Sequence, residues 1–180
     1  MNYHNITYPD QNNGDGLRIV LWVAGCEHHC TNCQNQQTWS PQSGIPFDKN
    51  AMNEILNELK KDYISGITFS GGDPLHPKNV QNVLKIVDEI RVSYPTKNIW
   101  LYTGYTWEQI MHLVITDINS EQLKMLQMRK ELVSKCDVLI DGRYIDELRD
   151  VSLHWRGSSN QRVINVQETL KQNQIVLWES

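Results

Sequence analysis

The sequence predicts an α/β fold in which βα units build a mostly parallel sheet. Short apolar runs typical of buried strands alternate with segments whose apolar residues recur at helical spacing. Hydrophobic residues make up 39% of the 180 residues, which is enough for a substantial core. We expect one domain over residues 1–180, because no repeat, low-complexity tract or change in composition marks a boundary. A closed (β/α)8 barrel is disfavoured, since it needs roughly 250 residues.

The first strand is expected at residues 17–24, a continuous apolar run that ends at Gly25. Such runs are typical of parallel strands that are buried on both faces. Asp48 is the expected N-cap of the first helix, because its carboxylate can accept the free backbone N–H groups of a first turn. The apolar face of that helix is formed by Met52, Ile55, Leu56 and Leu59.

The middle of the chain repeats the same alternation twice. A short β-rich run at residues 66–70 predicts a strand, and it closes on two glycines. The helix that follows has its apolar residues on one face, at Val80, Val83, Leu84, Val87 and Ile90. Residues 99–103 predict the next strand and residues 106–114 the next helix.

The last third predicts one more helix at residues 121–133 and one more strand at 137–140. Two weaker strand candidates follow, at 162–166 and 175–178. In a parallel sheet the functional turns lie at the carboxyl ends of the strands. The three turns in that position cover residues 25–37, 70–74 and 103–105.

Charge and hydropathy exclude several classes of partner. Seventeen basic and twenty-one acidic residues give a net charge of −4, so the basic footprint of a nucleic-acid-binding protein is missing. Residues 1–10 are polar, and the longest apolar run, residues 19–24, is far shorter than the roughly 20 residues of a membrane span. We therefore expect a cytoplasmic protein that binds no membrane, in which cysteines are ligands or catalysts rather than disulfide partners.

Three of the four cysteines stand in one loop directly after the first strand. Cys26, Cys30 and Cys33 form a C-x3-C-x2-C pattern, and no disulfide scheme pairs three cysteines. A [4Fe–4S] cluster held by three thiolates would keep one iron open. A structural zinc ion would need a fourth ligand. The candidates for that ligand are His28, His29, His76 and Cys136.

Cys136 stands alone at the entrance to an apolar strand. A single cysteine in such a place is usually a small buried hydrophobe, so we leave it out of the site.

The cysteine pattern and its surroundings resemble a known family. The C-x3-C-x2-C spacing is that of the radical S-adenosylmethionine (SAM) superfamily, and residues 14–39 resemble its glycyl-radical-enzyme activating proteins. Besides the cysteines, the matching residues are Gly14, Gly16, Leu17, Arg18, Asn35, Thr38 and Trp39. Asp15 departs from the family's usual Pro, and Asn32 stands where many relatives have an aromatic residue.

The resemblance implies a fold and a cofactor set. The fold would be an incomplete TIM-like barrel of βα units, whose open side can admit a polypeptide loop. Cys26, Cys30 and Cys33 would hold one [4Fe–4S] cluster, and SAM would chelate the open iron through its amino and carboxylate groups. Asn32 and Gln34 would join Cys33 at the cofactor. No catalytic side chain is expected beyond the cluster and the SAM site.

Two further turns resemble SAM-binding elements of this family. Gly71, Gly72 and Asp73 resemble its Gly-Gly-Glu motif, whose backbone meets the SAM amino group, although Gly-Gly-Asp-Pro is also an ordinary turn. A side chain at Gly72 is expected to invade the space of SAM and to leave the cysteine loop undisturbed. Asp141 and Arg143 resemble an Asp-x-Lys/Arg element that places the SAM carboxylate, and a solvated turn is the alternative.

Four blocks narrow the resemblance to the activating proteins of anaerobic ribonucleoside-triphosphate reductase. The blocks are residues 70–77, 100–105, 138–142 and 155–162, within a match that runs from about residue 1 to 162. That family implies a radical SAM oxidoreductase that makes a 5′-deoxyadenosyl radical. The radical then generates a glycyl radical on the large subunit of the reductase, and reduced flavodoxin or a similar protein donates the electron.

Several alternatives remain at this point. The substrate could be another glycyl radical enzyme or a small molecule, and the cysteine loop could belong to a zinc-binding interaction module without catalysis. The turn at residues 102–105 either lines the pocket or is an ordinary turn. The block at residues 155–162 is either a polar loop or a loop that faces the reductase, with Arg156 and Arg162 as the gripping side chains.

Overall fold

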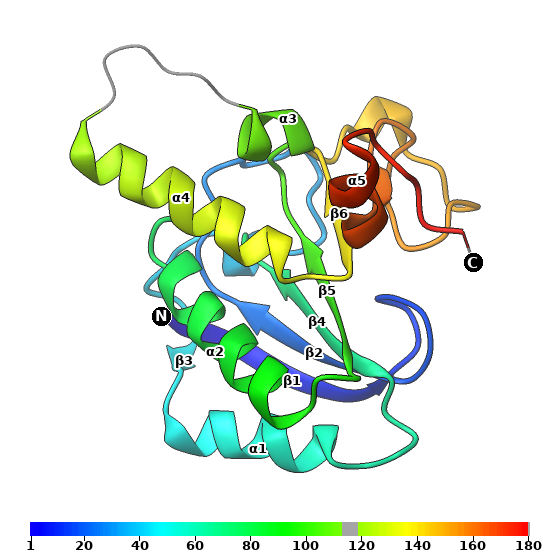
Figure 1. Ribbon diagram of the computed structural model, residues 1–180. Helices are drawn as coiled ribbons and strands as arrows, with labels where there is room; N and C mark the ends of the chain where they lie inside the picture. The colour runs from blue at the N-terminus through cyan, green and yellow to red at the C-terminus, as the bar shows by residue number, and fades with distance from the viewer. Residues whose placement is uncertain (113–118, 180) are drawn as a thin grey trace.

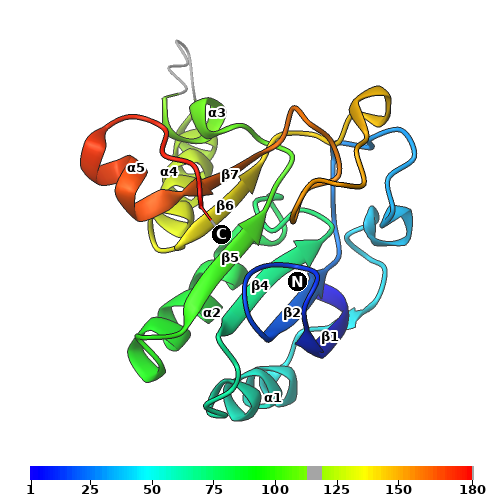
Figure 2. The same ribbon diagram turned by 90° about the vertical axis from the view of Figure 1, so that its right-hand side faces the viewer.

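The computed structural model describes residues 1–112 and 119–179, and over these ranges it has one seven-stranded sheet (Figures 1 and 2). The strand order is β3-β1-β2-β4-β5-β6-β7. The strands are β1 (Asn2–Asp10), β2 (Arg18–Val23), β3 (Ile45–Pro46), β4 (Gly66–Gly71), β5 (Asn98–Tyr102), β6 (Val138–Asp141) and β7 (Arg162–Asn165). The four central strands, β2, β4, β5 and β6, run parallel, which confirms the predicted α/β fold with a mostly parallel sheet.

Helices connect the parallel strands, as in βα units. They are α1 (Lys49–Leu59), α2 (Val80–Ser93), α3 (Trp107–Met111), α4 (Ser120–Ser134) and α5 (Val166–Gln172). Asp48 caps α1 as predicted, because its carboxylate accepts from the backbone N–H groups of Asn50 and Ala51 at 2.9 and 3.0 Å.

Alternation along the strands divides the sheet into two faces. In β2, Ile19, Leu21 and Val23 pack in the main core with the buried sides of α1, α2 and α4. Figures 1 and 2 show these helices on one side of the sheet. The residues between them, such as Val20 and Trp22, point to the opposite face. The main core therefore covers one face of the sheet, and the opposite face carries a smaller buried cluster of Trp100, Val138, Ile140 and Val163.

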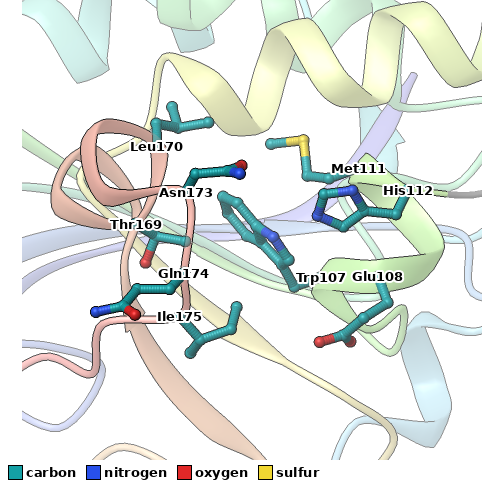
Figure 3. Close-up of a pocket in the computed structure, with 9 residues that line it drawn as sticks. All are labelled: Trp107, Glu108, Met111, His112, Thr169, Leu170, Asn173, Gln174 and Ile175. Atoms are coloured by element: carbon teal, nitrogen blue, oxygen red, sulfur yellow. The ribbon is translucent and has the colours of Figure 1, made fainter.

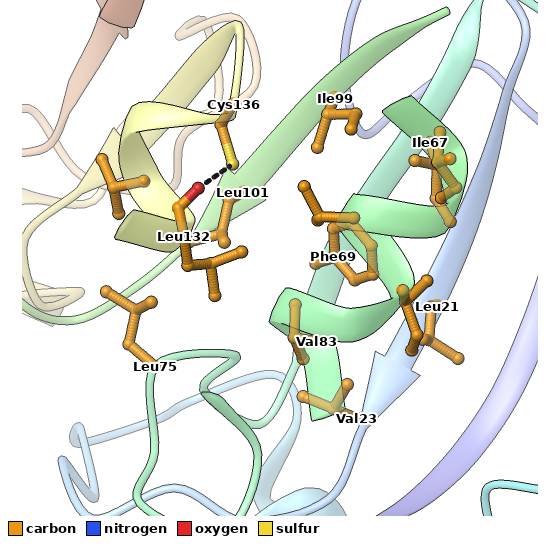
Figure 4. Packing of buried hydrophobic residues seen from close by; sticks show 14 of the residues in the cluster. Leu21, Val23, Ile67, Phe69, Leu75, Val83, Ile99, Leu101, Leu132 and Cys136 are labelled. Atoms are coloured by element: carbon orange, nitrogen blue, oxygen red, sulfur yellow. Dashed lines mark hydrogen bonds between the residues drawn. The ribbon is translucent and has the colours of Figure 1, made fainter. Parts of the chain in front are cut away.

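Cys136 lies in the main core, as predicted. Its side chain is fully buried beside Leu101 and Leu132, and its thiol donates to the Leu132 carbonyl at 3.3 Å (Figure 4). Burial raises the pKa of this thiol well above its usual range. Cys136 is therefore a packing residue.

The edges of the sheet differ from the prediction. β1 was not predicted, because only Tyr3 and Ile6 of its nine residues are buried and the rest are polar or exposed. β7 was predicted as a strand but runs antiparallel to β6. The predicted strand at 175–178 is reduced to one bridge, between Leu177 and Ile164.

Two helices also differ. No helix was predicted for the segment that forms α5. α3 ends at Met111, with His112 as its C-cap, so it is shorter than the predicted helix at 106–114. Residues 113 and 114 of that prediction lie outside the described residues. Within residues 1–112 and 119–179, no helix is long and apolar enough to cross a membrane.

Candidate functional site: a cysteine loop at the carboxyl edge of the sheet

The loops that follow the four parallel strands meet at one edge of the sheet, as expected. The backbone N–H of Asp73, after β4, donates to the Gly25 carbonyl, after β2, at 2.8 Å. At the other end of this edge, the N–H of Gly142 donates to the Tyr105 carbonyl at 3.0 Å. The three turns singled out in the sequence therefore lie along one edge of the sheet, together with the turn at residues 141–143.

The cysteine loop is anchored at its base and turned back by two residues with left-handed backbone. The N–H of Cys26 donates to the Trp39 carbonyl at 2.9 Å. His29 has a φ of 47° and stacks on the Trp39 ring, with 4.6 Å between the ring centroids. Asn32 has a φ of 54°, which suits Asn far better than an aromatic residue. The departure from the family at Asn32 therefore has a local backbone reason.

The three loop thiols are free and partly exposed, so they are available as ligands. Burial raises the pKa of the Cys26 thiol to about 11. The backbone N–H groups of His28 and His29 lower this pKa and so partly offset the effect of burial. Burial also raises the pKa of the Cys30 thiol, while the Tyr144 N–H and the positive charge of Arg143 lower it. Without a metal, both thiols are protonated at neutral pH, so metal binding must release protons.

The chemistry of the loop residues fits an iron–sulfur cluster. Such clusters are held by Cys thiolates, and the loop offers three free, partly exposed cysteines. Within the part of the chain that the structure describes, no three His, Cys, Asp or Glu side chains are grouped so that they could hold one metal ion.

Gly71 and Gly72 are required by the backbone of the neighbouring strand. Gly71 has a φ of +99°. A β-carbon on Gly72 would lie 2.5 Å from the Gly25 carbonyl oxygen, directly before Cys26. The expectation that a side chain at Gly72 leaves the cysteine loop undisturbed is therefore wrong, because Gly72 packs against the base of that loop.

Asp73 is buried, and both of its carboxylate oxygens are engaged within the protein. They accept from the Thr103 hydroxyl at 2.9–3.0 Å and from the N–H groups of Leu75 and Gly104 at 2.7 and 3.0 Å. The His28 ring nitrogen Nε2 completes the set at 2.7 Å. The turn at residues 102–105 is thus part of a built network around Asp73.

Tyr105 extends this network to α4. Its hydroxyl donates to the Glu27 carboxylate and accepts from Arg129 at 2.7 Å. The Arg129 guanidinium also stacks over the Tyr105 ring, 4.1 Å from its centroid. The sequence indicated neither Glu27 nor Arg129, since their positions carry no motif.

Asp141 and Arg143 lie at the same edge but in different environments. Asp141 is buried, and it accepts from the Trp107 N–H at 2.7 Å and from the Arg162 guanidinium. Arg162 also holds Glu108 at 2.9 Å and lowers the pKa of Glu108 to about 2. Arg143 is exposed beside Cys30, where its charge lowers the thiol pKa.

The block at residues 155–162 is held in place by hydrogen bonds within the chain. Gln161 accepts from the Gly157 N–H at 3.0 Å and donates to the Gly142 carbonyl at 3.0 Å. Arg156 donates to the Gln161 carbonyl at 2.7 Å. The expectation that Arg156 and Arg162 are free to grip a partner is therefore not supported by their contacts, because each guanidinium is bound within the chain.

A pocket of about 370 Å³ opens beside the cysteine loop, on the face opposite the helices. It is lined by two asparagines of the β1–β2 loop, by the cysteine loop, by one residue each of β2, β4 and β5, and by the segment between β6 and β7: Asn12, Asn13, Trp22, Cys33, Gln34, Asn35, Ser70, Tyr102, Tyr144, Leu153, Trp155, Arg156, Gly157 and Gln161. Pockets of this size hold small organic ligands. Two of the residues predicted at the cofactor, Cys33 and Gln34, line it. Asn32 is exposed, and its amide donates to Asp146 at 2.7 Å.

Two other pockets lie nearby. One, of about 510 Å³, is lined by Asp141, Arg143 and the turn at Gly104. Another, of about 360 Å³, lies between α3 and α5, with the Trp107 ring at its centre (Figure 3). None of the predicted site residues lines this last pocket, so we do not assign the site to it.

Comparison with known proteins decides between the two kinds of metal site. Residues 12–164 match a protein family described as a 4Fe-4S single cluster domain. Over 165 residues the chain is 42% identical to the anaerobic ribonucleoside-triphosphate reductase-activating protein of Escherichia coli, which covers 91% of this chain and 97% of that protein. The protein of the same name from Haemophilus influenzae is 42% identical over 163 residues, 89% of this chain and 96% of that protein.

The chain belongs to this family of reductase-activating proteins. The family description supports a [4Fe–4S] cluster in this chain and sets aside the zinc-binding module. Membership also confirms the resemblance that the sequence motifs indicated.

Proposed function

We propose that this protein activates an anaerobic ribonucleoside-triphosphate reductase by radical SAM chemistry. A 5′-deoxyadenosyl radical removes a hydrogen atom from one glycine Cα of the reductase large subunit and leaves a glycyl radical. The observation that carries the proposal is the loop of three free, partly exposed cysteines beside a ligand-sized pocket, in a chain of this family.

Cys26, Cys30 and Cys33 are the ligands we propose for the cluster. When bound, the reduced cluster supplies the electron that cleaves the sulfonium C–S bond of SAM. The loop supports this assignment in two ways. The N–H of Asn35 donates to the Cys33 sulfur at 3.4 Å. Burial raises the pKa of the Cys26 thiol, and the backbone N–H groups of His28 and His29 lower it. Such donors stabilise negative charge on the thiolates.

We propose that SAM lies in the pocket beside the cysteine loop. Cys33 and Gln34 line this pocket, and Asn32 stands at the turn beside them. Gly71 and Gly72 keep the neighbouring backbone close enough to offer main-chain groups. Arg143, exposed beside Cys30, is our candidate for the SAM carboxylate, since a guanidinium can bond both oxygens. We propose that Asp73 and Asp141 act indirectly in this site, because each holds neighbouring residues in place by hydrogen bonds.

The open face of the sheet suits a protein substrate. We interpret the sheet as an incomplete TIM-like barrel, with α1, α2 and α4 outside and the pocket on its inner face. Trp22, Tyr102 and Trp155 line that face and exclude water from one side of the pocket. The pocket remains open on the other side, where a glycine-bearing loop can enter. A cytoplasmic location and reduced flavodoxin as electron donor complete the proposal.

The test compares two reductions of the cluster-loaded protein. Reduction with SAM alone is expected to give 5′-deoxyadenosine, and reduction with SAM and the reductase is expected to add a glycyl radical signal in electron paramagnetic resonance. A second glycyl radical enzyme serves as the control substrate. Equal radical signals on both enzymes would contradict the assignment of the reductase as the partner.

A further inference from the structure

The side chain of His28 belongs to the cysteine loop but points into the protein. Its side chain is 4% exposed and that of Asp73 is 2% exposed, and Nε2 lies 2.7 Å from the Asp73 carboxylate. Since an ionised carboxylate can only accept, Nε2 carries the hydrogen and donates. The other ring nitrogen, Nδ1, is buried without a partner among the described residues. The ring is thus held by a single hydrogen bond.

The neighbouring loops are shaped around this ring. Asp73 is itself fixed by Leu75, Thr103 and Gly104, which leaves one direction for the bond to His28. The Tyr105 ring meets the imidazole edge-on, with 4.6 Å between the centroids.

Gly104 provides the space for the imidazole. A β-carbon there would lie 2.3 Å from Cδ2 of His28. Gly104 is not one of the glycines with positive φ, so its backbone does not require glycine. The His28 ring is therefore what excludes a side chain at this position.

The ring position also fixes the loop backbone next to Cys26. Burial raises the pKa of the Cys26 thiol, and the backbone N–H groups of His28 and His29 lower it, so these groups favour negative charge on the sulfur. His29 turns the chain with a left-handed φ of 47°, and its ring is stacked on Trp39. With His28 held by Asp73 and His29 held by Trp39, the backbone between them stays beside Cys26.

We propose that His28 and Asp73 form a clasp that positions Cys26 and the loop backbone beside it for cluster binding. His28 and Asp73 are therefore positioning residues. This inference rests on the proposed function only in taking Cys26 as a cluster ligand. Reduction adds one negative charge to a cluster, and N–H donors on its sulfurs stabilise that charge. Loss of the contact between His28 and Asp73 must therefore shift the reduction potential of the cluster to more negative values.

The first test measures the midpoint potential of the reconstituted cluster without SAM. His28→Ala removes the donor, and His28→Gln restores an amide donor at similar reach. We expect a more negative potential in His28→Ala and a return of at least half the shift in His28→Gln. Loss of iron from His28→Ala but not from His28→Gln supports the clasp equally. Potentials equal to wild type in both variants, or an equal shift in both, overturn it.

The second test is a double-mutant cycle with Gly104→Ala. The added methyl group displaces the intact ring, so the single variant is expected to shift the potential in the same direction as His28→Ala. In the His28→Ala background the same methyl group meets no ring and is expected to add less than a quarter of that shift. Additive shifts would overturn the proposal, because they would show that Gly104 acts independently of His28.

His112→Ala is the matched control, since His112 is an exposed histidine at the end of α3. Its potential is expected to equal that of wild type. The potential is measured without SAM or reductase, so a failure of the clasp and a failure of the proposed function give different results. Wild-type protein that holds a cluster but does not cleave SAM would overturn the function and leave the clasp testable.

Discussion

At the scale of single residues, the cysteines divide into three proposed cluster ligands and one core residue. Cys26→Ala, Cys30→Ala and Cys33→Ala are each expected to lose the brown cluster and SAM cleavage. Cys136→Ala is expected to keep iron near the wild-type content and to cost about 1 kcal/mol of stability, since it removes a small buried side chain. Iron analysis and thermal unfolding measure both effects. A folded Cys136→Ala protein without iron would contradict the division.

Gly72 is the residue at which the structure changes the prediction. Gly72→Ala would place a β-carbon 2.5 Å from the Gly25 carbonyl oxygen, so we expect a loss of about 2 kcal/mol or more in unfolding free energy. We also expect lower iron content, because Gly25 begins the cysteine loop. Urea unfolding and iron analysis test this expectation. Wild-type stability with full iron content would show that the backbone can move apart at no cost.

The sequence singles out some candidate site residues and misses the contacts of others. Cys26, Cys30 and Cys33 stand out because three cysteines within one loop are typical of a cluster site, and their role as ligands stays a prediction. The contacts of Asp73 could not be predicted, since they depend on Thr103 and His28, which lie 30 and 45 positions away in the chain. Pairings over such distances leave no periodic signal, so only the folded structure brings them together.

At the scale of elements, N-capping of α1 gives a local prediction. Asp48→Ala removes the acceptor of the Asn50 and Ala51 N–H groups and is expected to destabilise the protein by about 1 kcal/mol. Asp48→Asn keeps a side-chain oxygen in place and is expected to retain most of the wild-type stability. Thermal unfolding of both variants compares them. Equal losses would show that the charge, and not the cap, stabilises this end of the helix.

The central elements were predictable because burial on one or both faces imposes a pattern. β2 was predicted close to its observed bounds from an apolar run, and most of the buried face of α2 was predicted from helical spacing. The edge elements have weaker patterns. β1 is stabilised by pairing with β2, and α5 follows β7 with only Val166 and Thr169 buried. Tertiary contacts, which the local sequence does not encode, decide their structure.

At the scale of the whole molecule, Arg162 joins α3 to the end of the sheet through Glu108 and Asp141. Arg162 lowers the pKa of Glu108 to about 2, below its ordinary value of 4.5. A depressed carboxyl pKa stabilises the fold above the ordinary value, and this stability is lost as the pH falls through the folded value. The stability advantage of wild type over Glu108→Gln is therefore expected to be constant above pH 5 and to vanish towards pH 2.

Urea unfolding at a series of pH values measures this difference, with Glu147→Gln as a control on an exposed glutamate. A difference that persists unchanged at acid pH would contradict the role of the ion pair. The same contacts explain why Arg162→Ala is a poor probe of partner binding, since it leaves the buried Asp141 carboxylate without its countercharge and is expected to cost about 3 kcal/mol.

The central claim is that a radical made at the cysteine loop takes a hydrogen atom from a glycine of the reductase. The most direct measurement uses reductase grown with α-deuterated glycine, together with the cluster-loaded protein, a reductant and SAM. Mass spectrometry of the 5′-deoxyadenosine is expected to show one added deuterium, at the same time as the glycyl radical signal appears. A glycyl radical accompanied by 5′-deoxyadenosine without deuterium would contradict direct hydrogen transfer and with it the account given for this site.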